Sequence, residues 1–382
     1  MTSTTSRRLL AAAAIGVLVL APVAPAVAST STSASASPSR DLDRSLQAQL
    51  DRLTKEDKAP GALAYVTEAD GTSTTVVSGT AERGTGRPMV GADAKFRIGS
   101  ITKPVLAVTV LRLVEQGKIA LDAPVERYLP GVLRGTGAGA AIDGRKITVR
   151  GLLQQTSGLP DFMGAVDWSK PSQDYLKIAL GMKPTPAGRF AYANTNYLVA
   201  GMVVKAVTGR DFRAVSRDLV LEPLGMLGTY WPARGDTGLR KPYAHTYGVN
   251  PVDPQGGVVD VTRLPGYELG ASGGLVSTPE DLNRFWDGVF TGKVLSDRAF
   301  LKRTVAMKGG EWPVGSRYGF GMARVQMSCG TVWFHGGDVP GVFALSGRAS
   351  SGRQATVYTT GSMNGDKQFP HMIATLTTAL CP

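Results

Sequence analysis

The sequence predicts an α+β domain. In it, an antiparallel sheet of five or more strands, flanked by helices, is formed by both chain ends and carries an inserted, mainly helical lobe. Helical and turn-rich sequence fills the middle of the chain, from about 121 to 264. With 382 residues, 43% of them hydrophobic, the chain is long enough for one large domain with its own core. Strand-like runs lie near both ends, at 61–67, 73–78, 331–334, 342–347 and 354–359.

The first 28 residues have the pattern of an export signal. Arg7 and Arg8 precede an apolar run at 9–20, and a sequence of small residues ends at Ala28, the expected cleavage site. The alternative, a membrane anchor, is disfavoured because the apolar run is short and two prolines follow it. We therefore expect a secreted protein, exported by either the Sec or the twin-arginine route.

Composition changes sharply after the signal. Most of residues 29–40 are Ser, Thr or Ala. Because such residues cannot build a core, we expect this segment to form a flexible tail. The remainder, 41–382, is expected to form one domain, with a sheet lobe at about 41–115 and 266–382 and a helical lobe at about 116–265.

The chain has a formal net charge of +12, which stays basic after loss of the signal. Its basic residues are scattered and lack interleaved aromatic residues, which disfavours nucleic-acid binding. A solvated surface and attraction to an anionic envelope polymer remain as alternatives. Since no other long apolar segment follows, we expect no membrane anchor after cleavage. We also expect a monomer.

Several segments have helical spacing of apolar residues or a helix-ending signal. In the first of them, 41–57, leucines recur at 42, 46, 50 and 53. Asp70-Gly71 is a turn signal that joins the first two strands into a hairpin. The other predicted helices are 102–116, 149–155, 198–207 and 368–380.

Cys329 and Cys381 are the two cysteines of the chain. In an exported protein a disulfide is favoured over two free thiols. This bond would tie the C-terminal helix to the segment just before His335.

The sequence SITKP at 100–104 opens an apolar helical pattern. Because proline lacks an N–H, Pro104 is tolerated only in a first turn, so the helix begins near Ser100. The Ser100 hydroxyl then lies at the positive end of the helix dipole. Lys103 shares its face, and a partly desolvated amine there has a lowered pKa and can accept the serine proton. Ser-x-x-Lys also occurs by chance, and serine caps helices, so the motif alone does not establish a nucleophile.

A second candidate motif is Tyr192-Ala193-Asn194, in a polar segment before a helical run. A phenol beside an ammonium would have a lowered pKa and could carry a proton between Ser100 and a leaving group. The Asn194 amide can donate and accept, which suits binding of a substrate amide. A buried tyrosine followed by a turn-forming asparagine is the structural alternative.

A third candidate motif begins with His335, at the end of a strand pattern. Gly336 and Gly337 follow and would let a substrate backbone approach the strand edge closely. The amide of Asp338 can complete an oxyanion hole with that of Ser100. His335 is expected to titrate near neutrality and to shape the pH–rate profile. The rival basic-Gly-Gly sequence at 308–310 lacks a following strand, which favours His335.

In this order, the three motifs resemble those of the penicillin-recognising serine hydrolases. The sequences LLQQTSGLP, LEPLGMLGTY, GASGGLVSTPEDL and YGFGM are similar to the branch with soluble DD-carboxypeptidases, class C β-lactamases, D-aminopeptidases and related esterases. The resemblance spans roughly 46–381, and the cysteine pair is like that of a secreted DD-peptidase of this group. It implies a β-lactamase/transpeptidase-like fold and no metal or cofactor. The implied site residues are catalytic Ser100, Lys103 and Tyr192, and substrate-binding Asn194, His335, Gly336, Gly337 and Asp338.

The chain departs from this pattern where the secreted DD-peptidase binds the free carboxylate of its substrate. The positions of its two threonines and one arginine are Gly336, Asp338 and Ala323 here, although Arg324 is adjacent. Two like charges about 4 Å apart repel by about 4 kcal/mol at a surface-like dielectric. An inward-facing Asp338 would therefore oppose a substrate carboxylate.

We accordingly expect a serine hydrolase that acts through a Ser100 acyl-enzyme on amides or esters. Its closest description is a D-alanyl-D-alanine carboxypeptidase-like cell-wall peptidase with altered carboxylate recognition. The alternatives are a D-aminopeptidase, an esterase, a class C-like β-lactamase, or a penicillin-binding sensor without turnover. The expected substrates are a peptidoglycan-type peptide, a D-amino-acid amide, an ester or a β-lactam.

Overall fold

The structure is a computed structural model that describes residues 38–382 except 169, 171–172, 265–268, 308–311 and 363–367. The predicted export signal and the tail as far as residue 37 lie outside the described residues. At 38–40 the tail prediction is wrong, because the first helix already begins at Pro38. Proline suits the first turn of a helix, where its missing N–H has no partner to lose.

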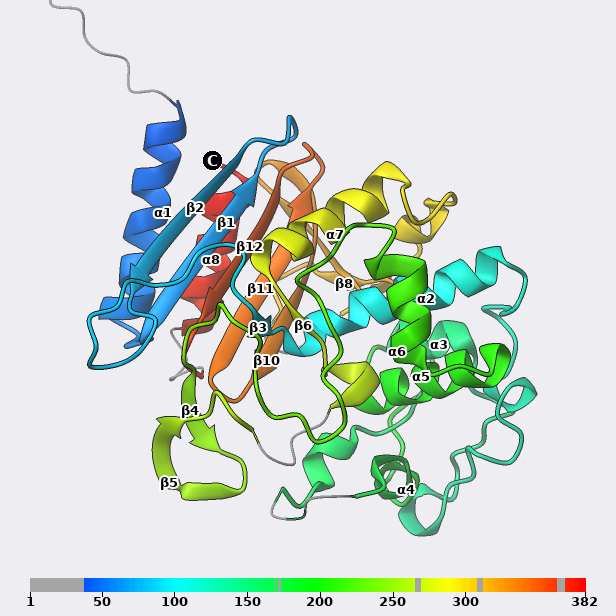
Figure 1. The fold of residues 1–382 in the computed structure, drawn as a ribbon. Helices are drawn as coiled ribbons and strands as arrows, with labels where there is room; N and C mark the ends of the chain where they lie inside the picture. Colours follow the sequence, from blue (N-terminus) through cyan, green and yellow to red (C-terminus); the bar gives the residue numbers. More distant parts are fainter. Residues whose placement is uncertain (1–37, 169, 171–172, 265–268, 308–311, 363–367) are drawn as a thin grey trace, which may run out of the picture. The chain divides into compact units, whose positions relative to one another are not determined.

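Figure 1 shows one large sheet with some helices against it and a second group of helices beside it. The helices are α1 (Pro38–Lys55), α2 (Thr102–Glu115), α3 (Val149–Leu153), α4 (Tyr175–Leu180), α5 (Asn194–Thr208), α6 (Phe212–Ser216), α7 (Pro279–Thr291) and α8 (Gln368–Leu380). The strands are β1 (Gly61–Thr67), β2 (Ser73–Gly79), β3 (Phe96–Arg97), β4 (Tyr247–Asn250), β5 (Asp253–Asp260), β6 (Val276–Ser277), β7 (Val305–Ala306), β8 (Arg317–Tyr318), β9 (Ala323–Met327), β10 (Gly330–Val339), β11 (Val342–Ala349) and β12 (Gln354–Thr359).

The sheet has eight antiparallel strands in the order β2-β1-β12-β11-β10-β9-β8-β7. The sheet joins the two ends of the chain, because β1 pairs with β12 from Ala62 opposite Thr359 to Thr67 opposite Gln354. The prediction of an antiparallel sheet built from both chain ends is thus confirmed. The strand expected at 331–334 is longer than predicted: β10 extends through the glycines to Val339.

Helices cover both faces of this sheet. On one face, α1 and α8 contact each other and the strands, and the four leucines of the α1 stripe are buried there. On the other face, α7 contacts β1, β11 and β12 (Figure 1). The central strands are therefore buried on both sides, which explains why β12 consists entirely of buried residues.

Two elements differ from the sequence analysis. Helix α7 was not predicted, although Thr278 caps it by accepting from the Asp281 amide and Pro279 follows at the first position. The predicted mainly helical middle also contains a hairpin, β4–β5, whose β5 strand is exposed throughout. A strand that is exposed throughout has no alternation of apolar and polar residues, so no period-2 pattern marks this segment.

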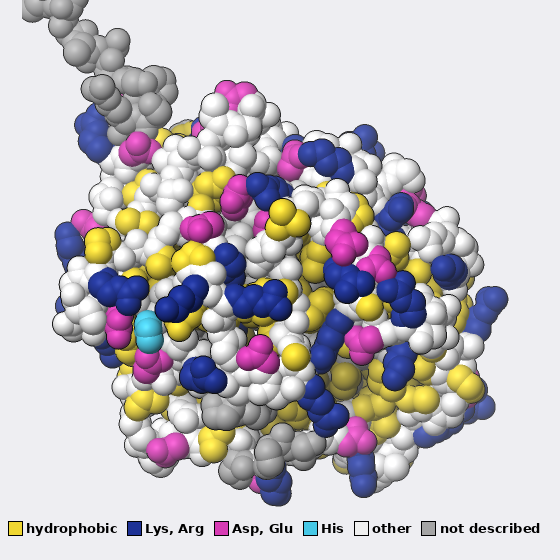
Figure 2. Space-filling view, in the orientation of Figure 1, with side chains coloured by type: hydrophobic (Ala, Val, Ile, Leu, Met, Phe, Trp, Pro, Cys, Tyr) yellow, Lys and Arg dark blue, Asp and Glu magenta, His cyan; other side chains and the backbone are white. Residues whose placement is uncertain are grey.

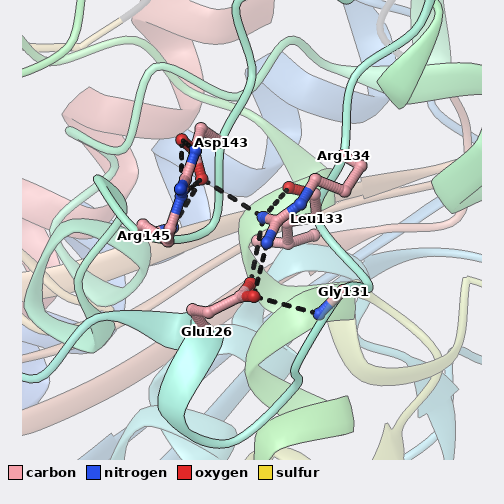
Figure 3. A network of polar contacts seen from close by, with 6 residues as sticks. All are labelled: Glu126, Gly131, Leu133, Arg134, Asp143 and Arg145. Carbon is pink, nitrogen blue, oxygen red and sulfur yellow. Dashed lines mark hydrogen bonds and ion pairs between the residues drawn. The ribbon is translucent and has the colours of Figure 1, made fainter.

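Ion pairs hold a loop-rich part of the middle in place (Figure 3). Arg134 donates to the Glu126 carboxylate at 2.5 and 3.0 Å, and the same carboxylate accepts from the Gly131 amide. Arg134 also reaches Asp143, which Arg145 binds from the other side. These contacts add to the backbone hydrogen bonds that already join 125–135 to 142–147.

The surface charge is dispersed. On the face shown in Figure 2, Lys and Arg side chains lie among Asp and Glu side chains rather than in one patch. No helix among the described residues combines the length and apolar character that a membrane span needs.

Cys329 and Cys381 form a disulfide that joins the β9–β10 turn to the residue after α8. This confirms the predicted pairing. The bond closes a loop across 52 residues of sequence.

Replacing both cysteines by serine should lower the free energy of unfolding by about 4 kcal/mol, because the cross-link removes that much chain entropy from the unfolded state. Urea denaturation of the variant and the parent protein measures this difference. Catalysis by the folded variant should be unchanged, since the bond lies at the Gly330 end of β10, away from His335. A loss below about 1 kcal/mol would contradict the expectation.

Candidate active site

Ser100 lies in a tight turn, η1 (Gly99–Ile101), that leads directly into α2. The prediction that the helix begins near Ser100 is confirmed, since α2 starts two residues later at Thr102. The turn is anchored from outside: the Ile98 amide donates to the Leu275 carbonyl, and the Leu275 amide donates to the Thr102 hydroxyl. Gly99 has φ +50, a conformation that favours glycine. The nucleophile candidate thus lies on rigid backbone.

Lys103 is fully buried beneath Ser100. Its Nζ lies 2.8 Å from Ser100 Oγ, 2.8 Å from Asn194 Oδ1 and 2.7 Å from the Ser272 carbonyl oxygen. Burial lowers the pKa of Lys103 to about 7, although the Asp161 charge opposes the shift. In the neutral amine, two N–H groups serve Asn194 and Ser272, which leaves the lone pair for the Ser100 hydroxyl. The geometry suits a general base.

Asn194 and Asp161 orient this amine. The Asp161 carboxylate accepts from the Asn194 side-chain amide at 3.1 Å and from the Asn194 backbone amide at 3.1 Å. Because Nδ2 faces Asp161, the oxygen of Asn194 must face Lys103. The structure therefore gives Asn194 a role that the sequence analysis did not assign. Its amide is engaged within the protein, which argues against the expected contact with a substrate amide.

Tyr192 lies next to the same amine, with Lys103 Nζ 4.9 Å from the centre of its ring. Burial among aromatic rings raises the pKa of Tyr192 well above its ordinary value, and a side-chain hydrogen bond to Ser100 opposes this only in part. The predicted lowering of this pKa is therefore wrong: desolvation outweighs the nearby amine, which is itself half neutral near pH 7. Tyr192 is a protonated phenol that can donate to a leaving group.

Gln155 holds the backbone on both sides of Tyr192. Its carbonyl oxygen accepts from the Ala191 amide at 2.8 Å, and its side-chain Oε1 accepts from the Ala193 amide at 3.0 Å. Gln155 is fully buried and has φ +59, which is strained for a residue with a Cβ. In this conformation, the carbonyl oxygen and Oε1 of Gln155 both face the backbone beside Tyr192.

His335 is buried behind the tyrosine and is not a surface base. Its Nδ1 lies 2.5 Å from the Gly336 carbonyl oxygen, so this nitrogen carries the proton, and Nε2 accepts from the Tyr318 hydroxyl at 3.0 Å. Burial, with the Lys103 charge, lowers the pKa of His335 to about 3. The expectation that His335 titrates near neutrality is therefore wrong, because no water reaches the ring to stabilise its charged form.

The two glycines after His335 serve different neighbours. A Cβ on Gly337 would lie 2.0 Å from the Ile98 carbonyl oxygen, so only glycine lets the nucleophile turn contact β10 there. The sequence analysis expected a substrate backbone to approach Gly337. The backbone that lies close to Gly337 belongs instead to Ile98 of this chain. Gly99 packs against Asp338 in the same way, which places the Asp338 amide beside the turn that carries Ser100. The backbone amides of Ser100 and Asp338 are the candidate oxyanion hole.

Half of β10 forms an open edge at the site. Strand β9 pairs only with 330–334 of β10, whereas β11 pairs along its length to Val339. Among the described residues, no strand pairs with the other edge of 335–339. An extended substrate can hydrogen-bond along this edge, as the sequence analysis expected.

A pocket of about 370 Å³, here called the aromatic pocket, opens at this edge. It holds the predicted Ser100, Tyr192, Gly336 and Asp338 together, while Lys103 and Asn194 lie below its floor. Its other lining residues are Trp312, Phe334, His335, Gly337, Phe343, Leu345 and Phe369.

The carboxylate-binding positions lack cations. Ala323 is buried opposite Phe334, and Arg324 stacks over Trp333, which points away from the aromatic pocket. The rival motif at 308–310 lies outside the described residues.

Sequence reasoning missed four residues that support the site: Asp161, Gln155, Ser272 and Tyr318. Two of them had local signals, since Asp161 follows a proline and caps a short turn, and Ser272 stands in a glycine-rich segment. Gln155 and Tyr318 act through long-range contacts that no local pattern encodes.

Comparison with known proteins agrees with this geometry. Residues 46–368 match the family model described as Beta-lactamase. The chain belongs to this family. It is a serine hydrolase with the family's fold, and the names of its relatives indicate different substrates.

Three relatives illustrate this range. Esterase EstB from Burkholderia gladioli is 32% identical over 200 residues, which are 47% of this chain and 49% of the esterase, so the chain spans about half of that relative's length. A D-stereospecific amidohydrolase from Streptomyces sp. is 29% identical, with a TM-score of 0.74 over 89% of this chain and 98% of that one. A D-amino acid amidase from Ochrobactrum anthropi SV3, complexed with L-phenylalanine amide, is 25% identical, with the same TM-score and coverage.

The pH dependence of acylation should follow Lys103. Because its pKa is about 7, kcat/KM for a chromogenic ester should rise as pH increases through 7 and Lys103 loses its proton. His335→Gln should lower the rate but move this limb by less than about half a pH unit, since the imidazole is neutral throughout the range. Loss of the limb in His335→Gln would contradict both assignments.

Gln155→Gly should lower kcat/KM by about tenfold to a hundredfold, because glycine accepts the φ angle but no longer holds the Ala193 amide beside Tyr192. The matched control is Lys58→Gly, at the other non-glycine residue with φ near +60, which is exposed. It should leave kcat/KM unchanged. Kinetics well below the unfolding temperature separate positioning from stability, and parental kcat/KM in Gln155→Gly would refute the role.

Proposed function

We propose that the protein hydrolyses amides or esters whose leaving group carries no carboxylate, through an acyl-enzyme on Ser100. The observation that carries this proposal is the buried, half-neutral amine of Lys103 at 2.8 Å from Ser100 Oγ, beside a pocket whose described lining has no Lys or Arg. An anionic leaving group would find no cationic partner among these described lining residues.

The reaction follows from the geometry. Lys103 accepts the Ser100 proton while Oγ bonds to the substrate carbonyl carbon, and the amides of Ser100 and Asp338 stabilise the oxyanion. Collapse of this intermediate breaks the bond to the leaving nitrogen or oxygen. Tyr192 donates its proton to that atom and is reprotonated by Lys103. Water then attacks the acyl-enzyme by the reverse proton path, which releases the acid and restores Ser100.

The relatives support an amidase or esterase. EstB is an esterase, and the two solved structures are named as enzymes for D-configured amides. A carboxypeptidase for D-Ala-D-Ala ends is the second candidate, favoured by the three motifs but opposed by Ala323 and Gly336 at the carboxylate-binding positions.

We also propose that the protein is exported and acts outside the cell. The N-terminal pattern through Ala28 and the disulfide between Cys329 and Cys381 both support this location.

A substrate panel tests the proposed function. D-alanine amide, a 4-nitrophenyl ester, a D-Ala-D-Ala peptide and a chromogenic cephalosporin are compared on the parent protein and on Ser100→Ala. We expect turnover of the amide or ester to exceed that of the D-Ala-D-Ala peptide by at least about tenfold, and Ser100→Ala to abolish it. Faster release of the C-terminal D-alanine would favour the carboxypeptidase instead.

A further inference from the structure

Two hollows are lined in part by residues of β10, and the position of the Tyr192 phenol distinguishes them. The aromatic pocket includes Ser100 and Tyr192. The second hollow, of about 520 Å³, begins at Val339 and includes Arg97 and Trp231, but neither Ser100 nor Tyr192 is in its described lining. A leaving group takes its proton from Tyr192, so we place it in the pocket that contains both Ser100 and Tyr192.

The walls of the aromatic pocket define the chemistry that it accepts. Phe343 on β11 and Phe369 on α8 lie with ring centres 5.9 Å apart and tilted by 49°. Trp312 and Phe334 form the neighbouring wall, with ring centres 5.6 Å apart. Benzene fits a cavity of about 150 Å³, so a pocket of about 370 Å³ has room for one ring and its linker.

Charge reinforces this selectivity. The described lining contains no Lys or Arg, and His335 stays neutral with a pKa of about 3. A carboxylate on the leaving group would therefore lose its hydration without a cationic partner among the described lining residues, whereas an aromatic ring gains contacts with tilted rings.

We propose that the leaving group of the natural substrate is an uncharged aromatic group that binds against Phe343 and Phe369, which makes these two residues determinants of specificity. The proposal rests on the proposed function, because it assigns a substrate class to the same Ser100 acyl-enzyme. It goes further by naming what occupies the pocket during acylation.

Esters that share one acyl group test this proposal. Benzyl acetate and acetoxyacetate give the same acetyl-enzyme, so deacylation is identical and the ratio of their kcat/KM values reports the leaving group alone. Comparing this ratio between variants cancels the intrinsic reactivity of the two esters. We expect the parent protein to prefer benzyl acetate.

Phe369→Ala should lower the ratio by about tenfold or more, since a hydrophobic wall is lost. Ile373→Ala is the matched control, because Ile373 lies one turn further along α8, is also partly buried and does not line the pocket. It should leave the ratio unchanged. Phe343→Leu keeps an apolar core residue and should lower the ratio too, and benzyl alcohol should inhibit both phenylalanine variants less strongly than the parent.

Failure of this proposal differs from failure of the proposed function. Suppose that a fluorophosphonate labels Ser100 but the ratio of kcat/KM values is unchanged in Phe369→Ala and Phe343→Leu. That result would overturn only the aromatic leaving group. A preference of the parent protein for acetoxyacetate would do the same. Absence of labelling and of ester hydrolysis would overturn the acyl-enzyme itself.

Discussion

The structure depends on one buried amine. Lys103 has no access to solvent, and its three hydrogen-bond partners come from the nucleophile turn, the start of α5 and the turn at Ser272. A permanent charge at this place would be costly, and the Asp161 carboxylate compensates for only part of the lost hydration. The amine is therefore poised between its two protonation states at neutral pH, as a general base should be.

The two side chains near this amine, Tyr192 and His335, are uncharged and held in fixed positions. Tyr192 remains a phenol, and His335 remains an uncharged imidazole fixed by Gly336 on one side and Tyr318 on the other. Because neither competes with Lys103 for the proton of Ser100, the direction of proton transfer is defined. Rigid backbone enforces the arrangement, through the strained Gln155 beside Tyr192 and the glycine contact between Gly337 and Ile98.

The sequence was informative wherever local rules apply. Pro104 and the helical period place Ser100 and Lys103 on one face, and β-branched runs locate β1 and β12 at their observed bounds. Protonation states were not predictable in this way. The pKa of Tyr192 depends on Trp312, Tyr318 and His335, whose rings are brought around it only by the folded sheet.

The same distinction explains the revised roles. Asn194 was identified by its motif, but only the three-dimensional structure shows that Asp161 turns its oxygen toward Lys103. Gly337 was correctly placed at a close approach, and the approaching backbone proved to be that of Ile98. Local sequence thus located the chemistry, whereas contacts between distant segments decided how each group is used.

Direct titration of Lys103 is the most decisive measurement. Protein labelled with ¹³C at the lysine ε-carbon, with Lys103→Arg to assign the signal, gives the midpoint of this group by NMR. The account predicts a midpoint near pH 7. A midpoint near the ordinary lysine value of about 10.4 would show a permanently charged ammonium, and Lys103 could then not be the base that activates Ser100.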